Sequence, residues 1–89
     1  MMRVYENPSS VNSPINIVFE IPNDAYAHIS ISDIQGREVA LIENRLFLTG
    51  SNTVIWDGHD NSGQSLSAGI YFIVIRSGGA EETVKIIRR

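Results

Sequence analysis

Apolar and polar residues alternate with a period of two along most of this chain. From Ile15 to Ile21 the odd positions are apolar, and from Ala25 to Ile31 every second residue is apolar again. This alternation is typical of a strand with one buried face, because successive side chains of a strand point to opposite sides. No apolar i, i+3, i+4, i+7 pattern persists over three turns, so the sequence predicts no helix.

Turn-forming residues divide the pattern into seven expected strands. These strands cover residues 15–21, 25–32, 38–41, 46–48, 53–56, 69–76 and 83 to the end of the chain. Short strands at this spacing predict an all-β fold, a seven-stranded antiparallel immunoglobulin-like (Ig-like) β-sandwich. Residues 1–14 contain Pro8 and Pro14 and are expected to be a linker or leader, which leaves residues 15–89 as the domain.

The stretch around Trp56 is expected to organise the core. Trp56 is the only tryptophan and ends one apolar run, and an Asp/Gly/Asn/Ser loop separates it from the next apolar run. Aromatic side chains bury more surface than any others, so a small domain gains most by packing around them. The expected core therefore consists of Trp56, Phe19, Ile31 and Phe72.

The composition of the chain argues against several classes of function. The 89 residues suffice for one domain, and a net charge of −3 with basic residues clustered only at Lys85, Arg88 and Arg89 gives no electrostatic basis for binding nucleic acid. Without cysteine the chain has neither disulfides nor a thiolate metal site. The longest apolar run, residues 70–75, is far shorter than the roughly 20 residues of a membrane span, so no membrane insertion is expected.

The loop after Trp56 contains candidate calcium ligands. Asp57, Asp60 and Asn61 supply the clustered oxygens that Ca²⁺ prefers. Counted from Asp57, however, Ser62 stands where the EF-hand loop needs glycine for its sharp turn. The favoured interpretation is that Asp and Asn side chains cap turns here, with calcium binding as the less favoured alternative.

Other catalytic or cofactor chemistry finds no support in the sequence. His28 and His59, the two histidines, are not at the spacing of a zinc site. No nucleophile elbow or paired acid–base site is visible. We therefore predict a domain that is not an enzyme and that needs no cofactor.

Six short motifs occur in order at a familiar spacing. They are Asn7-Pro8, residues 15–22, residues 31–39, Trp56-Asp57-Gly58-x-Asp60-x-x-Gly63, Ala68-Gly69-Ile70-Tyr71-Phe72 and Thr83-x-Lys85-Ile86-Ile87. With these motifs the chain resembles the type A C-terminal sorting domains of the type IX (Por) secretion system, found at the ends of exported proteins in Bacteroidetes. It also resembles the related FlgD-type Ig-like domain.

The sorting-domain resemblance implies a function in protein transport. Such a domain is a seven-stranded Ig-like sandwich that directs an N-terminal cargo domain through the periplasm to the outer-membrane translocon. The sorting and attachment machinery then commonly removes the domain and leaves the cargo at the cell surface. By position, the residues of the family's recognition motifs are Gly69, Ile70, Tyr71, Lys85, Ile86 and Ile87.

Two details at the ends of the chain bear on this resemblance. The family's opening Pro-Asn-Pro motif falls on Glu6, Asn7 and Pro8, so its first proline is missing. The basic ending at Arg88 and Arg89 fits a sorting domain better than an internal FlgD-like module.

The sequence leaves two alternatives open. One is an Ig-like accessory or interaction module, either FlgD-like or attached to a hydrolase as a spacer or carbohydrate binder. The second open question is the role of Lys85. This residue would either contact a receptor carboxylate or protect an exposed strand edge from aggregation.

Overall fold

The computed structural model describes residues 2–5 and 13–89, with only the backbone of residues 3–5. Within these residues the chain forms strands and turns, and no helix there is long and apolar enough to cross a membrane. The strands are β1 (Met2–Tyr5), β2 (Ile15–Ile21), β3 (Ala25–Ser32), β4 (Glu38–Phe47), β5 (Gly50–Trp56), β6 (Gly69–Ser77) and β7 (Ala80–Arg88).

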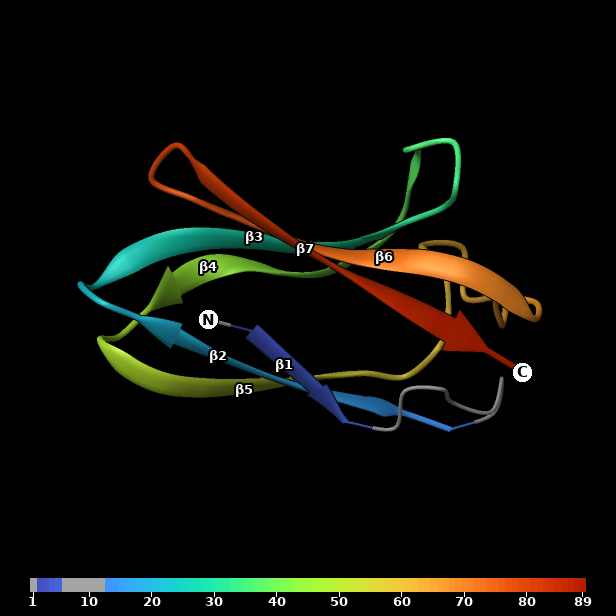
Figure 1. Cartoon of the computed structure of the whole chain (residues 1–89), viewed down its shortest axis with the longest axis horizontal. Coiled ribbons are helices and arrows are strands. Elements are labelled where there is room, and N and C mark those ends of the chain that lie inside the picture. Colours follow the sequence, from blue (N-terminus) through green and yellow to red (C-terminus); the bar gives the residue numbers. More distant parts are fainter. Residues whose placement is uncertain (1, 6–12) are drawn as a thin grey trace.

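The strands form two antiparallel sheets that face each other. One sheet has the order β1-β2-β5 and the other β4-β3-β6-β7. Figure 1 shows the two layers, with β7 crossing the front of the sandwich so that its C-terminal end approaches the sheet of β2. This arrangement confirms the predicted all-β, Ig-like sandwich.

Inward-facing apolar residues of both sheets make one core. Ile15, Ile17 and Phe19 of β2 lie fully or almost fully buried, as the period-two pattern predicts. Across the sandwich, Phe47 of β4 meets Phe19 edge-to-face, with ring centroids 5.0 Å apart and the planes at 80°. Other buried members of the core are Ile29, Ile31, Val54, Trp56, Tyr71, Ile73 and Ile86.

The strand boundaries differ from the predicted ones at β4. Residues 38–41 and 46–48 were expected to belong to two strands, but Glu38–Phe47 is one strand with irregular register against β3. The polar stretch Glu43-Asn44-Arg45 continues this strand because β4 is a sheet edge, where polar side chains are tolerated. The Arg45 guanidinium also lies 3.9 Å from the ring centroid of Phe47.

The start of the chain also differs from the prediction. From Ile15 onward the chain forms six strands instead of seven, and a further strand, β1, lies in the segment expected to be a linker. β1 pairs with β2 from Met2 opposite Phe19 to Tyr5 opposite Asn16, and the Met2 side chain is buried in the core. The other part of the expected linker, residues 6–12, lies outside the described residues.

One expected core residue takes a different position. Trp56, Phe19 and Ile31 are buried, whereas Phe72 is half-buried and does not belong to the core. The cause is strand parity, because Tyr71 and Ile73 on either side of Phe72 point inward. Phe72 therefore lies on the outer face of the four-stranded sheet.

The contact between Phe19 and Phe47 predicts an energetic coupling between the sheets. Replacing each phenylalanine by leucine, singly and together, should reveal a coupling energy of about 0.5–1.5 kcal/mol in a double-mutant cycle of urea unfolding. Leu48→Ala is a control, because Leu48 is 64 % exposed and its truncation should change the free energy of unfolding by less than about 0.5 kcal/mol. Additive effects of the two leucine substitutions would contradict the prediction.

Candidate functional site

Six residues were expected from the sorting-domain resemblance to serve recognition, and all of them lie on the paired strands β6 and β7, namely Gly69, Ile70, Tyr71, Lys85, Ile86 and Ile87. Their register places Ile70 opposite Ile87 and Tyr71 opposite Ile86, while Gly69 faces Arg88. Side chains of cross-strand partners point to the same face of a sheet, so the six residues divide between two faces. The motif residues are therefore neighbours, but they do not form one surface.

Tyr71 and Ile86 point into the core. Ile86 is fully buried and Tyr71 is 9 % exposed. The Tyr71 hydroxyl donates a hydrogen bond of 2.9 Å to the carbonyl oxygen of Ser67, four residues upstream. This geometry is similar to the tyrosine corner of Ig-like sandwiches, in which the hydroxyl fixes the turn that leads into a strand.

The backbone conformation at position 69 explains why this residue is a glycine. Its φ angle is +152°, a backbone conformation that residues with a side chain rarely adopt. A Cβ at this position would lie 3.9 Å from the Tyr71 ring. The Gly-x-Tyr motif thus shapes the entry into β6.

Ile70, Lys85 and Ile87 point outward. Ile70 is 43 % exposed and Ile87 37 % exposed, and they lie directly opposite each other across β6 and β7. Lys85 is exposed on the same face and lies opposite the half-buried Phe72. These outward residues, together with Phe72, form an apolar patch with one cation beside a sheet edge, which we call the hairpin face.

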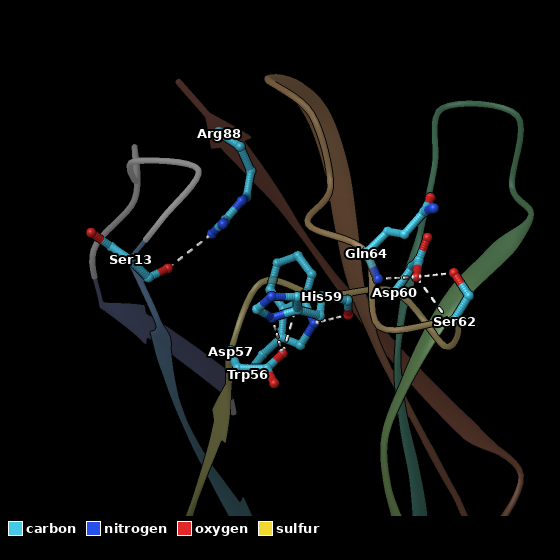
Figure 2. A network of polar contacts seen from close by, with 8 residues as sticks. All are labelled: Ser13, Trp56, Asp57, His59, Asp60, Ser62, Gln64 and Arg88. Atoms are coloured by element: carbon cyan, nitrogen blue, oxygen red, sulfur yellow. Dashed lines mark hydrogen bonds and ion pairs between the residues drawn. The ribbon is translucent and has the colours of Figure 1, made fainter.

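Arg88 has a structural role that its sequence pattern did not reveal. It was interpreted as part of a basic ending, but its side chain is only 1 % exposed. The guanidinium carbon lies 4.8 Å from the centroid of the Trp56 ring, and Nη1 donates to the carbonyl oxygen of Ser13 at 3.2 Å. Figure 2 shows Arg88 reaching from the end of β7 toward Ser13. Burial lowers the pKa of the Arg88 guanidinium below its ordinary value.

Trp56 anchors the start of the loop below Arg88. Its indole Nε1 donates to the carbonyl oxygen of His59 at 3.0 Å. The backbone nitrogen of His59 in turn donates to the Asp57 carboxylate at 2.9 Å, a hydrogen bond that lowers the pKa of Asp57. Gly58 between them is buried and has a φ of +88°. The Trp56-Asp57-Gly58 motif is a tight turn built around the indole.

Asp60 organises the second half of the loop. Its Oδ1 accepts hydrogen bonds from the Ser62 hydroxyl at 2.7 Å, the Ser62 backbone nitrogen at 2.9 Å and the Gln64 backbone nitrogen at 3.0 Å (Figure 2). These bonds, with the Ser62 hydroxyl contributing most, lower the pKa of the Asp60 carboxyl. Asp60 thus caps a turn in the way expected of Asp in loops.

Asn61 connects the loop to the edge strand β4. Its Oδ1 accepts from the Leu41 backbone nitrogen at 2.8 Å, and its backbone nitrogen donates to the Val39 carbonyl oxygen at 3.1 Å. Asp57, Asp60 and Asn61, the candidate calcium ligands, therefore each hold a separate part of the loop. Among the residues that the structure describes, no group of three or more His, Cys, Asp or Glu side chains is placed to hold a metal ion.

The Asp60 hydrogen bonds predict a contribution to acid unfolding. Because the pKa of Asp60 is lower in the folded than in the unfolded chain, its stabilisation is present above a pH of about 4 and is lost as the pH falls through the folded-state pKa. Asp60→Asn should therefore reduce the loss of stability between pH of about 6 and about 3, measured as the urea midpoint. Gln64→Ala should retain the full loss, because Gln64 donates through its backbone; an unchanged pH dependence in Asp60→Asn would contradict this assignment.

The buried position of Arg88 predicts a large difference between the last two residues. Arg88→Ala removes the cation over Trp56 and the packing of the side-chain stem, and should lower the free energy of unfolding by about 2–4 kcal/mol. Arg89→Ala is the matched control, because Arg89 is exposed and should change stability by less than about 0.5 kcal/mol. Equal effects in chemical denaturation would show that Arg88 does not seal the core.

Comparisons with known proteins agree with this architecture. No curated protein matches the chain. A solved structure of PorZ, described as an essential bacterial surface component of the type IX secretion system of Porphyromonas gingivalis, is similar with a TM-score of 0.65 and 16% sequence identity. The match covers 99% of this chain and 11% of PorZ, so the chain spans a small part of that protein's length. At this identity the likeness concerns the fold.

The family assignment comes from the sequence itself. The model of the FlgD Ig-like domain family matches residues 7–81, which is well over half of the chain. The matched range extends from before β2 into β7 and includes the Trp56 loop and the Gly69-x-Tyr71 turn. The chain therefore belongs to the FlgD Ig-like domain family.

Proposed function

We propose that this domain is a non-enzymatic sorting signal that directs a larger exported protein through the type IX secretion system. In this proposal the parent protein carries an N-terminal cargo domain, and the sorting domain meets the outer-membrane translocon after passage through the periplasm. The likeness of nearly the whole chain to a part of PorZ supports the proposal, as do the sorting motifs. The main observation behind the proposal is that the motif residues divide into two groups: some are buried in the core, and the others are exposed on the hairpin face.

The hairpin face has the chemistry of a recognition surface. Ile70 and Ile87 offer apolar area at a sheet position where solvent-facing residues are normally polar. Lys85 adds one positive charge beside them, which suits a receptor carboxylate. Because β7 is the edge strand of the described four-stranded sheet, a receptor strand could pair along it while its side chains contact this face.

The inward motif residues act through the fold in this proposal. Tyr71, Ile86 and Gly69 set the shape of the turn and the position of β6 and β7. They keep the hairpin face rigid, and preorganisation of this kind lowers the entropic cost of binding. Loss of sorting after a change at Tyr71 would therefore follow from misfolding, whereas loss after a change at Lys85 would follow from a lost contact.

The family assignment favours a second candidate function. In this second candidate function, the domain is an Ig-like accessory or interaction module inside a larger protein and has no sorting function; the match to the FlgD Ig-like domain model supports it. The two functions differ in what they require of the hairpin face, because an accessory module does not need it for export.

A reporter experiment separates these functions. We expect a secreted reporter fused to residues 1–89 to reach the surface of a bacterium with a working type IX system. The double variant Lys85→Glu, Ile87→Ser should reduce surface delivery by about tenfold or more, since a lost recognition contact of at least about 1.4 kcal/mol has that effect. Circular dichroism and the melting temperature of the isolated domain must show that the variant folds.

The matched control introduces the same two residues, Glu and Ser, on the opposite sheet. Thr53→Glu with Ile55→Ser alters two exposed residues of β5, where Ile55 is 63 % exposed, and should leave delivery unchanged. Equal loss in both variants would remove the special role of the hairpin face. A reporter that stays in the periplasm even with the intact domain would contradict the sorting function and favour the accessory module.

A further inference from the structure

An open, mostly apolar groove lies at the end of the sandwich opposite the Trp56 loop. It has a volume of about 460 Å³ and lies between the end of β2 and the hairpin turn that joins β6 to β7. In Figure 1 this turn stands well away from the β2–β3 connection. Apolar side chains that line the groove include Phe19, Ile21, Pro22, Ala25, Ile75 and Ala80.

The ladder between β1 and β2 leads directly into this groove. In the described residues the ladder begins with Met2 opposite Phe19, whereas β5 accompanies β2 on its other side as far as Ile21, opposite Gly50. A strand that kept the β1 register upstream of Met2 would therefore pass Glu20 and then Ile21. Ile21 lines the groove and is 5 % exposed.

Glu82 lies where it can receive such a strand. The Met2 backbone nitrogen donates to Glu82 Oε2 at 2.9 Å, so this N–H points away from β2 and toward the beginning of β7. Backbone N–H directions alternate along a strand, so the N–H two residues upstream would point toward the same part of β7. Glu82 shares strand parity with the buried Ile86, which places its carboxylate at the mouth of the groove.

We infer that the groove is the docking site for an extended polypeptide segment that precedes the domain in its parent chain. This inference rests on the proposed function in one respect, namely that a cargo segment lies upstream. Continued pairing along β2 would hold the segment, and every second side chain would enter the groove. Since Met2 is buried on the Phe19 side, the residue directly before Met1 would be the next to face inward, opposite Ile21. An apolar residue is expected there.

Two extensions with the same composition test this inference. In one, serine and then isoleucine precede Met1, so that the isoleucine takes the inward position. In the other the order is reversed, so that the isoleucine faces solvent. The first extension should raise the melting temperature by about 5 °C relative to the second, because it alone buries the isoleucine.

Amide hydrogen exchange supplies a second readout. Because the Met2 N–H points away from β2, a strand that continues the β1 register upstream would form a hydrogen-bonded pair at its next position, opposite Glu20. The Glu20 amide should therefore exchange about tenfold more slowly in the first extension than in the second. Glu82→Ala should reduce the gain in melting temperature, whereas Arg89→Ala should not.

Three results would overturn the inference. They are equal melting temperatures for the two extensions, an unchanged Glu20 exchange rate, or a dimer of the unextended chain that already protects Glu20, which would assign the groove to a second copy. None of these measurements uses secretion. If the extensions show no effect, the docking inference fails but the proposed sorting function is not affected. If the reporter experiment fails, the docking inference is still tested by the melting temperatures and the Glu20 exchange rate.

Discussion

The contact of Arg88 with Trp56 closes one end of the sandwich, and the rest of the structure depends on it. Trp56 ends β5 and fixes the following turn through its hydrogen bond to His59. Arg88 ends β7, covers the indole and reaches the backbone at Ser13, just before β2 begins. Three segments far apart in the sequence therefore meet at one buried cation. A buried guanidinium is costly unless aromatic and carbonyl groups compensate it, so the geometry must be maintained by all three segments.

This closure explains why the motifs of the chain serve two purposes. The path of the chain into β6 is determined by the Trp56 turn, Gly69 and Tyr71. The side chains of Ile86 and Arg88 are buried and pack β7 against the core. The same two strands carry Ile70, Lys85 and Ile87 on their outer face. A sequence motif that spans both faces of a strand thus combines buried residues that maintain the fold with exposed residues, to which the proposed function assigns contact with a receptor. Under the proposed function, a substitution on the inward face would impair sorting by destabilising the fold, and one on the outward face by removing a receptor contact.

Much of the fold was predictable from the sequence, because period-two alternation is a local property. It located β2, β3 and β6 well and predicted burial of Phe19, Ile31 and Trp56. The prediction was wrong where tertiary context decides. The polar residues at 43–45 suggested a turn, but they continue an edge strand.

The remaining errors have equally specific causes. Pro8 and Pro14 suggested a linker and concealed β1, a strand whose partner lies more than ten residues away. Arg88 was missed because arginine at a chain end is normally solvated. Strand parity with Ile86 would have placed it inside. Parity would equally have assigned Phe72 to the outer face.

The proposed function requires that the outward side of β6 and β7 contact the export machinery while the inward side only maintains the fold. A photo-crosslinking amino acid at position 85, compared with one at position 55 on the opposite sheet, tests this claim during export of a cargo fusion. The account predicts covalent adducts with translocon or sorting components from position 85 and none from position 55. Adducts from position 55 alone, or equal adducts from both positions, would contradict it.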